Sequence, residues 1–120
     1  MRTLRWSSAG HSPPVITSPG GQARCLSVGL ELPLGVGIAV PRRDHLDPVP
    51  AGSTVVLFTD GLIECSREWI DTGLERLVAL AEEHADLPLR SFVQAVSDRH
   101  PSDGHDDLAV LLARTPTGPV

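Results

Sequence analysis

The stretch STVVLFTDG, residues 53–61, carries the clearest strand signal in the chain and an acidic turn directly after it. Residues 54–58 are all β-branched or large and apolar, so they predict a strand, and their continuity predicts burial on both faces. Asp60 and Gly61 form a turn dipeptide that ends the strand. The stretch therefore predicts a buried strand with a carboxylate at its C-terminal end.

Upstream of this stretch, short strands alternate with turn residues. We expect strands at residues 3–8, 15–17 and 23–28, the last two joined into a hairpin by Pro19-Gly20-Gly21. The segment LELPLGVGIAVP, residues 30–41, reads as a loop, and HLDPVPAGS, residues 45–53, as another strand and turn.

Downstream, the apolar spacing changes to a helical period. Thr72 and Glu75 form a capping box that predicts the start of a helix reaching about Ala85. A second helix is expected from Pro88 to His100-Pro101, and a final buried strand at residues 108–113. Strands followed by a helix pair and a last strand predict the α+β class.

Composition excludes several kinds of protein. The 120 residues fit one small domain, and the net charge of −5 argues against nucleic acid as a partner. The two cysteines, Cys25 and Cys65, lack metal-site or redox spacing and fit a reduced, cytoplasmic protein. The apolar runs are too short for a membrane span, so no membrane association is expected.

Two acidic spots flank the two most apolar strands. Asp60 follows one, and Asp106-Asp107 precede the other. If these strands are antiparallel neighbours, both spots meet at one end of the sheet. Carboxylate oxygens there suit hard cations such as Mg²⁺ or Mn²⁺. Taken alone, each spot is better explained as an ordinary acidic turn.

Five segments together resemble a known enzyme family. They are SSAGHSPPVI (7–16), LPLGV (32–36), VVLFTDGLIE (55–64), IDTGLERL (70–77) and HDDLAVLLAR (105–114). Their order and spacing resemble the C-terminal half of a PPM-type (type 2C-like) serine/threonine phosphatase domain, in the bacterial branch of SpoIIE and the sigma-factor regulator phosphatases. The resemblance implies a partial β-sandwich of antiparallel strands, with the helix pair on one face. It implies that residues 1–114 form the C-terminal portion of that domain and that 115–120 are a disordered tail.

The resemblance also implies site residues. Asp60 and Asp106 match metal ligands of a two-metal site that holds Mn²⁺ or Mg²⁺. Asp107 is implied to support the ligands as a hydrogen-bond acceptor, and Gly61 to allow a sharp backbone exit after Asp60. His11 is implied to lie at the rim of the site, with a locally packed turn histidine as the alternative.

The implied activity is hydrolysis of phosphoserine or phosphothreonine on a regulatory protein, such as an anti-sigma-factor antagonist. The nucleophile would be a water activated by two metals, with no side chain as direct acid or base. Family members also carry an N-terminal half with a Gly-Gly-Asp segment whose acid bridges the metals, and this sequence has no match to it. We therefore expect an incomplete site and weak or absent activity for this chain alone.

Several alternatives remain open at this point. The partner of the chain is expected to be the missing N-terminal half or a second copy of itself. In the first reading, the chain is a phosphatase from a mis-started or split gene, and the partner half lies upstream. The chain is otherwise a degenerate, non-catalytic fragment that acts as a protein-binding module. A self-sufficient β-rich binding module with coincidental motifs is the third reading.

Overall fold

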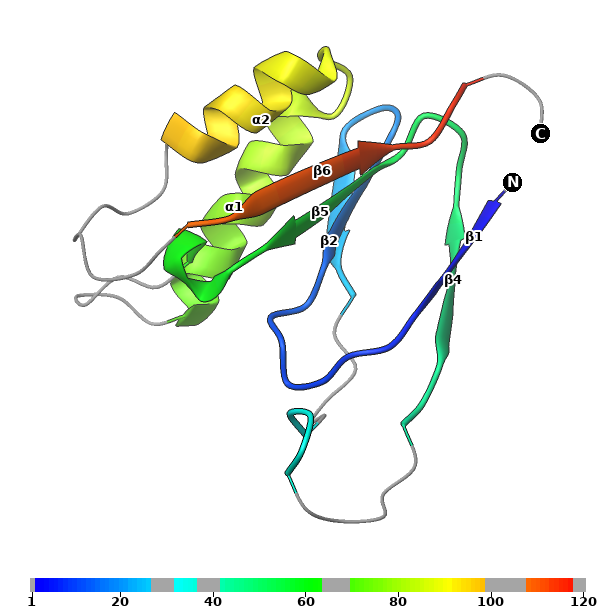
Figure 1. Ribbon diagram of the computed structural model, residues 1–120. Helices are drawn as coiled ribbons and strands as arrows, with labels where there is room; N and C mark the ends of the chain where they lie inside the picture. Colours follow the sequence, from blue (N-terminus) through cyan, green and yellow to red (C-terminus); the bar gives the residue numbers. More distant parts are fainter. Residues whose placement is uncertain (1, 27–31, 37–41, 64–69, 99–107, 118–120) are drawn as a thin grey trace.

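An antiparallel sheet of four strands organises the chain (Figure 1). The computed structural model describes residues 2–26, 32–36, 42–63, 70–98 and 108–117. Its elements are β1 (Arg2–Trp6), β2 (Val15–Ser18), β3 (Gln22–Cys25), β4 (His45–Val49), β5 (Thr54–Phe58), the 3₁₀ turn η1 (Asp60–Leu62), α1 (Ile70–His84), α2 (Leu89–Asp98) and β6 (Val110–Arg114). Four strands form one sheet in the order β3-β2-β5-β6, and β1 pairs with β4 in a second sheet. All of these pairs are antiparallel, so the predicted α+β class is confirmed.

The β2–β3 hairpin forms where the sequence predicts it. Gly20 and Gly21 have φ of +96° and +92°, which glycine adopts without the strain of a Cβ atom. The N–H of Gly21 donates to the carbonyl oxygen of Ser18 at 3.2 Å and closes the turn. The third strand is shorter than the predicted 23–28, and residues 27–28 lie outside the described part.

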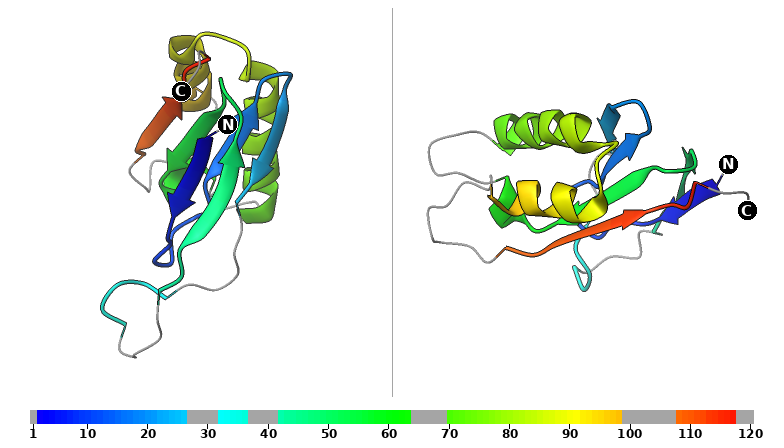
Figure 2. Two further views of the ribbon diagram at one scale, coloured as in Figure 1. Left: turned by 90° about the vertical axis from the view of Figure 1, so that its right-hand side faces the viewer. Right: turned by 90° about the horizontal axis from the view of Figure 1, so that it is seen from above.

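Helices α1 and α2 cover one face of the four-stranded sheet (Figure 2). Val56 and Phe58 of β5 point to this face and are buried. Leu77 of α1 packs in the same core, together with Phe92 and Val96 of α2, which are fully buried. The helical spacing of apolar residues therefore predicted both helices.

The β1–β4 sheet packs over part of the opposite face. This second, smaller core consists of Ile16, Leu26 and Val49, with Leu4, Trp6 and Val55 packed against them. The indole N–H of Trp6 donates to Asp47 at 2.8 Å, and its ring centre lies 4.8 Å from that of His45. The two sheets together form a partial sandwich.

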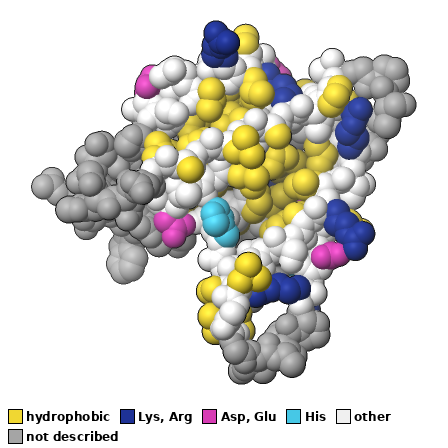
Figure 3. Space-filling model, in the orientation of Figure 1, with side chains coloured by type: hydrophobic (Ala, Val, Ile, Leu, Met, Phe, Trp, Pro, Cys, Tyr) yellow, Lys and Arg dark blue, Asp and Glu magenta, His cyan; other side chains and the backbone are white. Residues whose placement is uncertain are grey.

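No other described residue packs over the rest of the opposite face. Figure 3 shows hydrophobic side chains gathered over the middle of this face. Leu57 and Leu111 are 42% and 61% exposed. The prediction that residues 54–58 are buried on both faces is therefore wrong, as is that of a fully buried last strand, where only Leu112 is buried. The cause is that the helices cover one face completely, whereas β1 and β4 cover the other only in part.

Helix α1 begins before its predicted cap. Thr72 is the third residue of α1, so the predicted Thr72–Glu75 capping box is wrong. Gly73, in the first turn, is buried against the chain that leaves β5: a Cβ atom there would lie 2.0 Å from the carbonyl oxygen of Ile63. The missing side chain lets α1 approach this backbone closely.

The chain after β6 returns to the turn between β4 and β5. The N–H of Thr115 donates to the carbonyl oxygen of Ser53 at 2.8 Å, and that of Gly52 donates to Pro116 at 3.3 Å. We expected a disordered tail from Thr115, but these bonds hold Thr115 and Pro116 in place, and residues 118–120 lie outside the described part. Within the described residues, no helix has the length and apolar character needed to span a bilayer.

Candidate metal centre

Asp60 lies at the C-terminal end of β5, where the strand turns into η1. Its side chain is exposed. The N–H of Leu62 donates to Thr59 and that of Ile63 to Asp60, each at 3.0 Å, and these bonds make the 3₁₀ turn. Gly61 lies inside this turn and is not among the described glycines with positive φ. The left-handed freedom of glycine is therefore not what turns the chain after Asp60, contrary to the role expected for Gly61.

Thr59 ties this strand end to the start of β6. Its N–H donates to the carbonyl oxygen of Ala109 at 3.0 Å, and its hydroxyl accepts from the Ala109 N–H at 2.9 Å. The pairing continues the β5–β6 ladder one residue beyond Phe58 and Val110. The condition set by the sequence, that these two strands are antiparallel neighbours, is thus met.

The other predicted acids lie beyond the described part of the chain. Asp106 and Asp107 belong to residues 99–107, which the structure does not describe. In the sequence, Asp107 directly precedes Leu108 and Asp106 precedes it by two positions. Leu108 is the described residue next to Ala109. Their assignment as a ligand and as a supporting acceptor stays a prediction.

Ser12 brings a second segment to Asp60. Its hydroxyl donates a short hydrogen bond to Oδ1 of Asp60, across 48 residues of sequence. Ser12 belongs to the AGHS turn that follows β1, whereas Asp60 follows β5. The sequence pattern did not point to Ser12, because a serine beside two prolines is an ordinary turn residue.

His11 lies beside Ser12 on the same turn. Its Nδ1 lies 2.9 Å from the carbonyl oxygen of Ser12. A carbonyl oxygen only accepts, so Nδ1 carries the proton in this bond, which makes Nε2 the nitrogen without a proton in a neutral ring. His11 is thereby placed near Asp60 through Ser12. This local bond is also what the alternative of a turn histidine predicts, so the assignment of His11 to the rim of the site stays a prediction.

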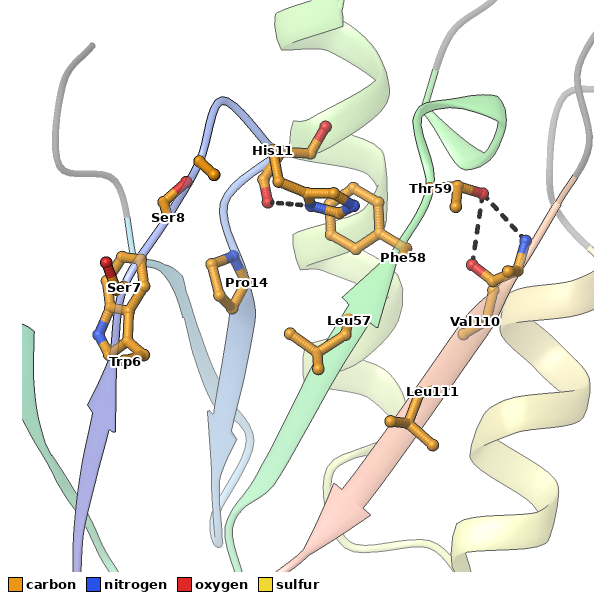
Figure 4. A pocket seen from close by; sticks show the side chains of 13 residues that line it. Trp6, Ser7, Ser8, His11, Pro14, Leu57, Phe58, Thr59, Val110 and Leu111 are labelled. Carbon is orange, nitrogen blue, oxygen red and sulfur yellow. Dashed lines mark hydrogen bonds between the residues drawn. The ribbon is translucent and has the colours of Figure 1, made fainter. Parts of the chain in front are cut away.

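A cavity of about 420 Å³ opens between this turn and the ends of β5 and β6. Figure 4 shows His11 and Thr59 at one end of it, next to Phe58, with Leu57 and Leu111 farther along. The remaining wall comes from Trp6, at the end of β1, and from the segment that joins β1 to β2, including Pro14. The cavity is mostly apolar, and its polar lining includes Ser12, which donates to Asp60.

The donors at this edge are oxygen atoms. Among the described residues, no three His, Cys, Asp or Glu side chains gather into a metal-binding group, and Asp60 supplies one carboxylate. An exposed carboxylate with a hydroxyl bonded to one oxygen fits a hard cation such as Mg²⁺ or Mn²⁺, and it does not fit a thiolate site for a soft metal.

Solved structures of known proteins are similar to this chain in their fold. The chain is similar to the structure of the RsbU and RsbW domains of Rv1364c from Mycobacterium tuberculosis, with 23% identity and a TM-score of 0.79 over 98% of this chain and 34% of that one. It is also similar to the PP2C phosphatase domain of SpoIIE from Bacillus subtilis with a fragment of its regulatory domain, with 21% identity and a TM-score of 0.63 over 93% of this chain and 34% of that one. The SpoIIE phosphatase domain in a crystal form without domain swapping gives 20% identity and a TM-score of 0.56 over 98% of this chain and 52% of that one.

These structures share the fold of the chain, which is that of PP2C-type phosphatase domains. The chain spans about a third to about a half of the solved chains it matches. The profile of the family described as Stage II sporulation protein E (SpoIIE) matches residues 1–116, nearly the whole sequence. The chain therefore belongs to the SpoIIE family.

Proposed function

We propose that this chain forms one side of the metal site of a PPM-type protein serine/threonine phosphatase. The observation that carries the proposal is the Thr59–Ala109 pairing, which fixes the end of β5 beside the start of β6. Asp60 follows the first of these strand ends, and Asp106 precedes the second in the sequence. Carboxylates from adjacent strand ends make an oxygen site of the kind that hard cations prefer.

In this proposal Asp60 and Asp106 hold Mn²⁺ or Mg²⁺. Bound cations would supply activation of an attacking water and neutralisation of phosphate charge. Asp60 is exposed beside the cavity, so a phosphorylated side chain can reach it from solvent. Asp107 would hold the loop that carries Asp106, and His11 would line the approach to the site.

We infer that two carboxylates bind these cations only weakly. Mg²⁺ gives up its water shell reluctantly, so affinity depends on several protein ligands. The solved relatives are two to three times longer than the part matched here, and their additional residues are the proposed source of further ligands. The chain alone is therefore expected to show little turnover.

The proposed substrate class is a phosphoserine or phosphothreonine protein, such as an anti-sigma-factor antagonist. Support comes from family membership and from the similarity to an RsbU domain. Asp60 lies beside an open cavity and not in a deep pocket, which suits a phosphorylated residue presented on the surface of a folded protein.

The metal site is tested by titrating Mn²⁺ into the chain and following water-proton relaxation. We expect weak binding by the wild type, and loss of the bound fraction in both Asp60→Asn and Asp106→Asn. Asp44→Asn is the matched control, because Asp44 pairs with Arg5 on the exposed β1–β4 sheet. Equal binding by all four proteins would overturn the proposal.

Activity is tested separately with a phosphoserine peptide at millimolar Mn²⁺. We expect a trace of turnover at most, and any turnover should disappear in Asp60→Asn. Turnover that survives this substitution would contradict the role given to Asp60.

A second candidate is a non-catalytic protein-binding module. The exposed Leu57 and Leu111 on the open sheet face favour it, because such apolar surface is typical of binding sites. The Mn²⁺ titration separates the two candidates, since a binding module has no reason to hold a cation at Asp60.

A further inference from the structure

The hydrogen bond between Ser12 and Asp60 differs from a contact within a turn, because its two residues belong to separate segments. It joins the predicted metal ligand to a turn that is remote in sequence. Ser12 donates to Oδ1 of Asp60, so this bond leaves the other oxygen of the same carboxylate unused. The hydroxyl therefore fixes the direction of the carboxylate without occupying all of its acceptor sites.

The turn that carries Ser12 is itself held in place. Gly10 has φ of +81°, and a Cβ atom there would lie 2.9 Å from Cγ of Pro33. The side chain of Arg42 donates to the carbonyl oxygens of Ser8, at 3.2 Å, and of Leu32. The AGHS turn is thus packed against the LPLGV segment and tied to it by Arg42.

His11 adds a bond at Ser12 itself. Its Nδ1–H donates to the backbone carbonyl oxygen of Ser12, on the residue whose side chain contacts Asp60. The backbone carbonyl of Ser12 is therefore held by His11, and its hydroxyl is directed at Asp60 before any cation arrives. Groups that orient a metal ligand in this way raise metal affinity because less order must be imposed on binding.

We propose that Ser12 is a positioning residue that holds the carboxylate of Asp60 in the orientation that binds the divalent cation. This inference rests on the proposed function, because it requires Asp60 to be a ligand. Ser12 does not contact the substrate in this proposal and acts only through Asp60.

The experiment compares Ser12→Thr with Ser12→Val in the full chain. The two side chains have nearly the same shape, and only threonine keeps a hydroxyl. We expect Ser12→Thr to bind Mn²⁺ within about threefold of the wild type and Ser12→Val to bind it about tenfold or more weakly, the range measured when supporting groups of metal ligands are removed. Water-proton relaxation measures the affinity without any need for catalysis.

Two controls separate positioning from folding. Ser7→Ala removes an exposed serine hydroxyl from the same loop and should leave Mn²⁺ affinity unchanged. The thermal midpoint without metal, followed by circular dichroism, should be the same for Ser12→Thr and Ser12→Val within about 3 °C, a shift that corresponds to less than a typical hydrogen bond.

The outcomes distinguish this inference from the function on which it rests. If the wild type binds Mn²⁺ and both variants bind equally well, the inference is overturned and the metal site stands. If the wild type does not bind Mn²⁺, both fall. Weaker binding by Ser12→Val alone, with an unchanged midpoint, supports the inference.

Discussion

Leu57 and Leu111 face each other across β5 and β6 on the side of the sheet away from the helices. Their neighbours Val56 and Leu112 form the adjacent cross-strand pair and point into the helix-covered core. The pairing of β5 with β6 therefore places one pair of side chains in the core and the next pair on the exposed face. The alternation of buried and exposed positions along β5 and β6 follows from the period of two in a strand.

Because Leu57 and Leu111 are exposed, Leu111→Thr should change the surface properties of the chain more than its stability. Leu111 is 61% exposed, so the substitution removes little buried area and should change the free energy of unfolding by less than about 0.5 kcal/mol. Binding of the dye ANS and self-association should both decrease, because the apolar patch becomes smaller. Urea unfolding, ANS fluorescence and sedimentation velocity measure these effects.

Leu112→Ala is the matched control on the next residue. Leu112 is only 9% exposed, so its truncation should cost about 2–4 kcal/mol through lost burial and a cavity. If Leu111→Thr destabilises the chain as much as Leu112→Ala, another part of the chain covers the face in solution.

Arg114 bridges β5 to the turn between the helices. Its Nε donates to Oγ1 of Thr54 at 2.8 Å, and its two terminal nitrogens donate to the carbonyl oxygens of Leu87 and Ala85. Arg114→Ala leaves these acceptors without their donor and should cost about 2–3 kcal/mol. Arg90→Ala, at an exposed position of α2, should cost less than about 0.5 kcal/mol. Equal urea midpoints for the two variants would show that the bridge contributes no stability.

Gly73→Ala should reverse the usual effect of alanine in a helix. Alanine normally favours a helix over glycine by about 1 kcal/mol. At position 73 its Cβ would meet the carbonyl oxygen of Ile63 at 2.0 Å, so we expect net destabilisation of about 1–3 kcal/mol from overpacking. Chemical denaturation gives the sign directly.

Thr72→Ala tests the start of the same helix. At the third position of α1, exposed alanine should be neutral or slightly stabilising. If the free energy of unfolding instead falls by about 1 kcal/mol, as expected for removal of an N-cap, Thr72 caps the helix as the sequence predicted.

The sequence predicted the elements of the fold better than their burial. Apolar period and turn residues are local signals, so the β2–β3 hairpin and both helices were found near their true bounds. The burial of Leu57 and Leu111 depends on what packs over the sheet, and strand composition does not contain that information. The start of α1 was misplaced by about two residues, because the cap pattern is read from a few neighbouring residues and does not contain the packing of the first turn, such as that of Gly73 against Ile63.

For the candidate site, the sequence predicted the neighbouring strands but missed a residue that contacts Asp60. The sheet order confirms that β5 and β6 are neighbours, which was the condition for Asp60 and Asp106 to converge. Ser12 was missed because its bond to Asp60 depends on how the turn after β1 packs beside β5. Only three-dimensional packing reveals such a partner, since the residue type alone indicates nothing more than a turn.

Cys25 provides a prediction about pH. It is a half-buried free thiol, and burial raises its pKa because the thiolate loses hydration. The folded thiol holds its proton to higher pH than the unfolded one, so its contribution to stability is complete below the ordinary thiol pKa and is lost as pH rises through the folded value. In a Cys65→Ser background, alkylation of Cys25 is measured as a function of pH in the folded chain and in urea. The pH at which the rate rises should be higher for the folded chain. Superimposable curves in the two conditions would contradict the effect of burial.

Thr59→Val tests the link between the two strand ends that flank the proposed metal site. The Ala109 N–H donates to the Thr59 hydroxyl, and the same hydroxyl donates to the Ala109 carbonyl oxygen at 3.4 Å. Valine keeps the branched shape but offers no acceptor, so we expect a loss of about 1–2 kcal/mol and faster hydrogen exchange at the Ala109 amide. Thr59→Ser keeps the hydroxyl and should preserve slow exchange. If the segment at Ala109 also orients Asp106, Thr59→Val should weaken Mn²⁺ binding, whereas Thr59→Ser should not. Unchanged hydrogen exchange at the Ala109 amide in the valine variant would show that the Thr59 hydroxyl does not hold the two strand ends together.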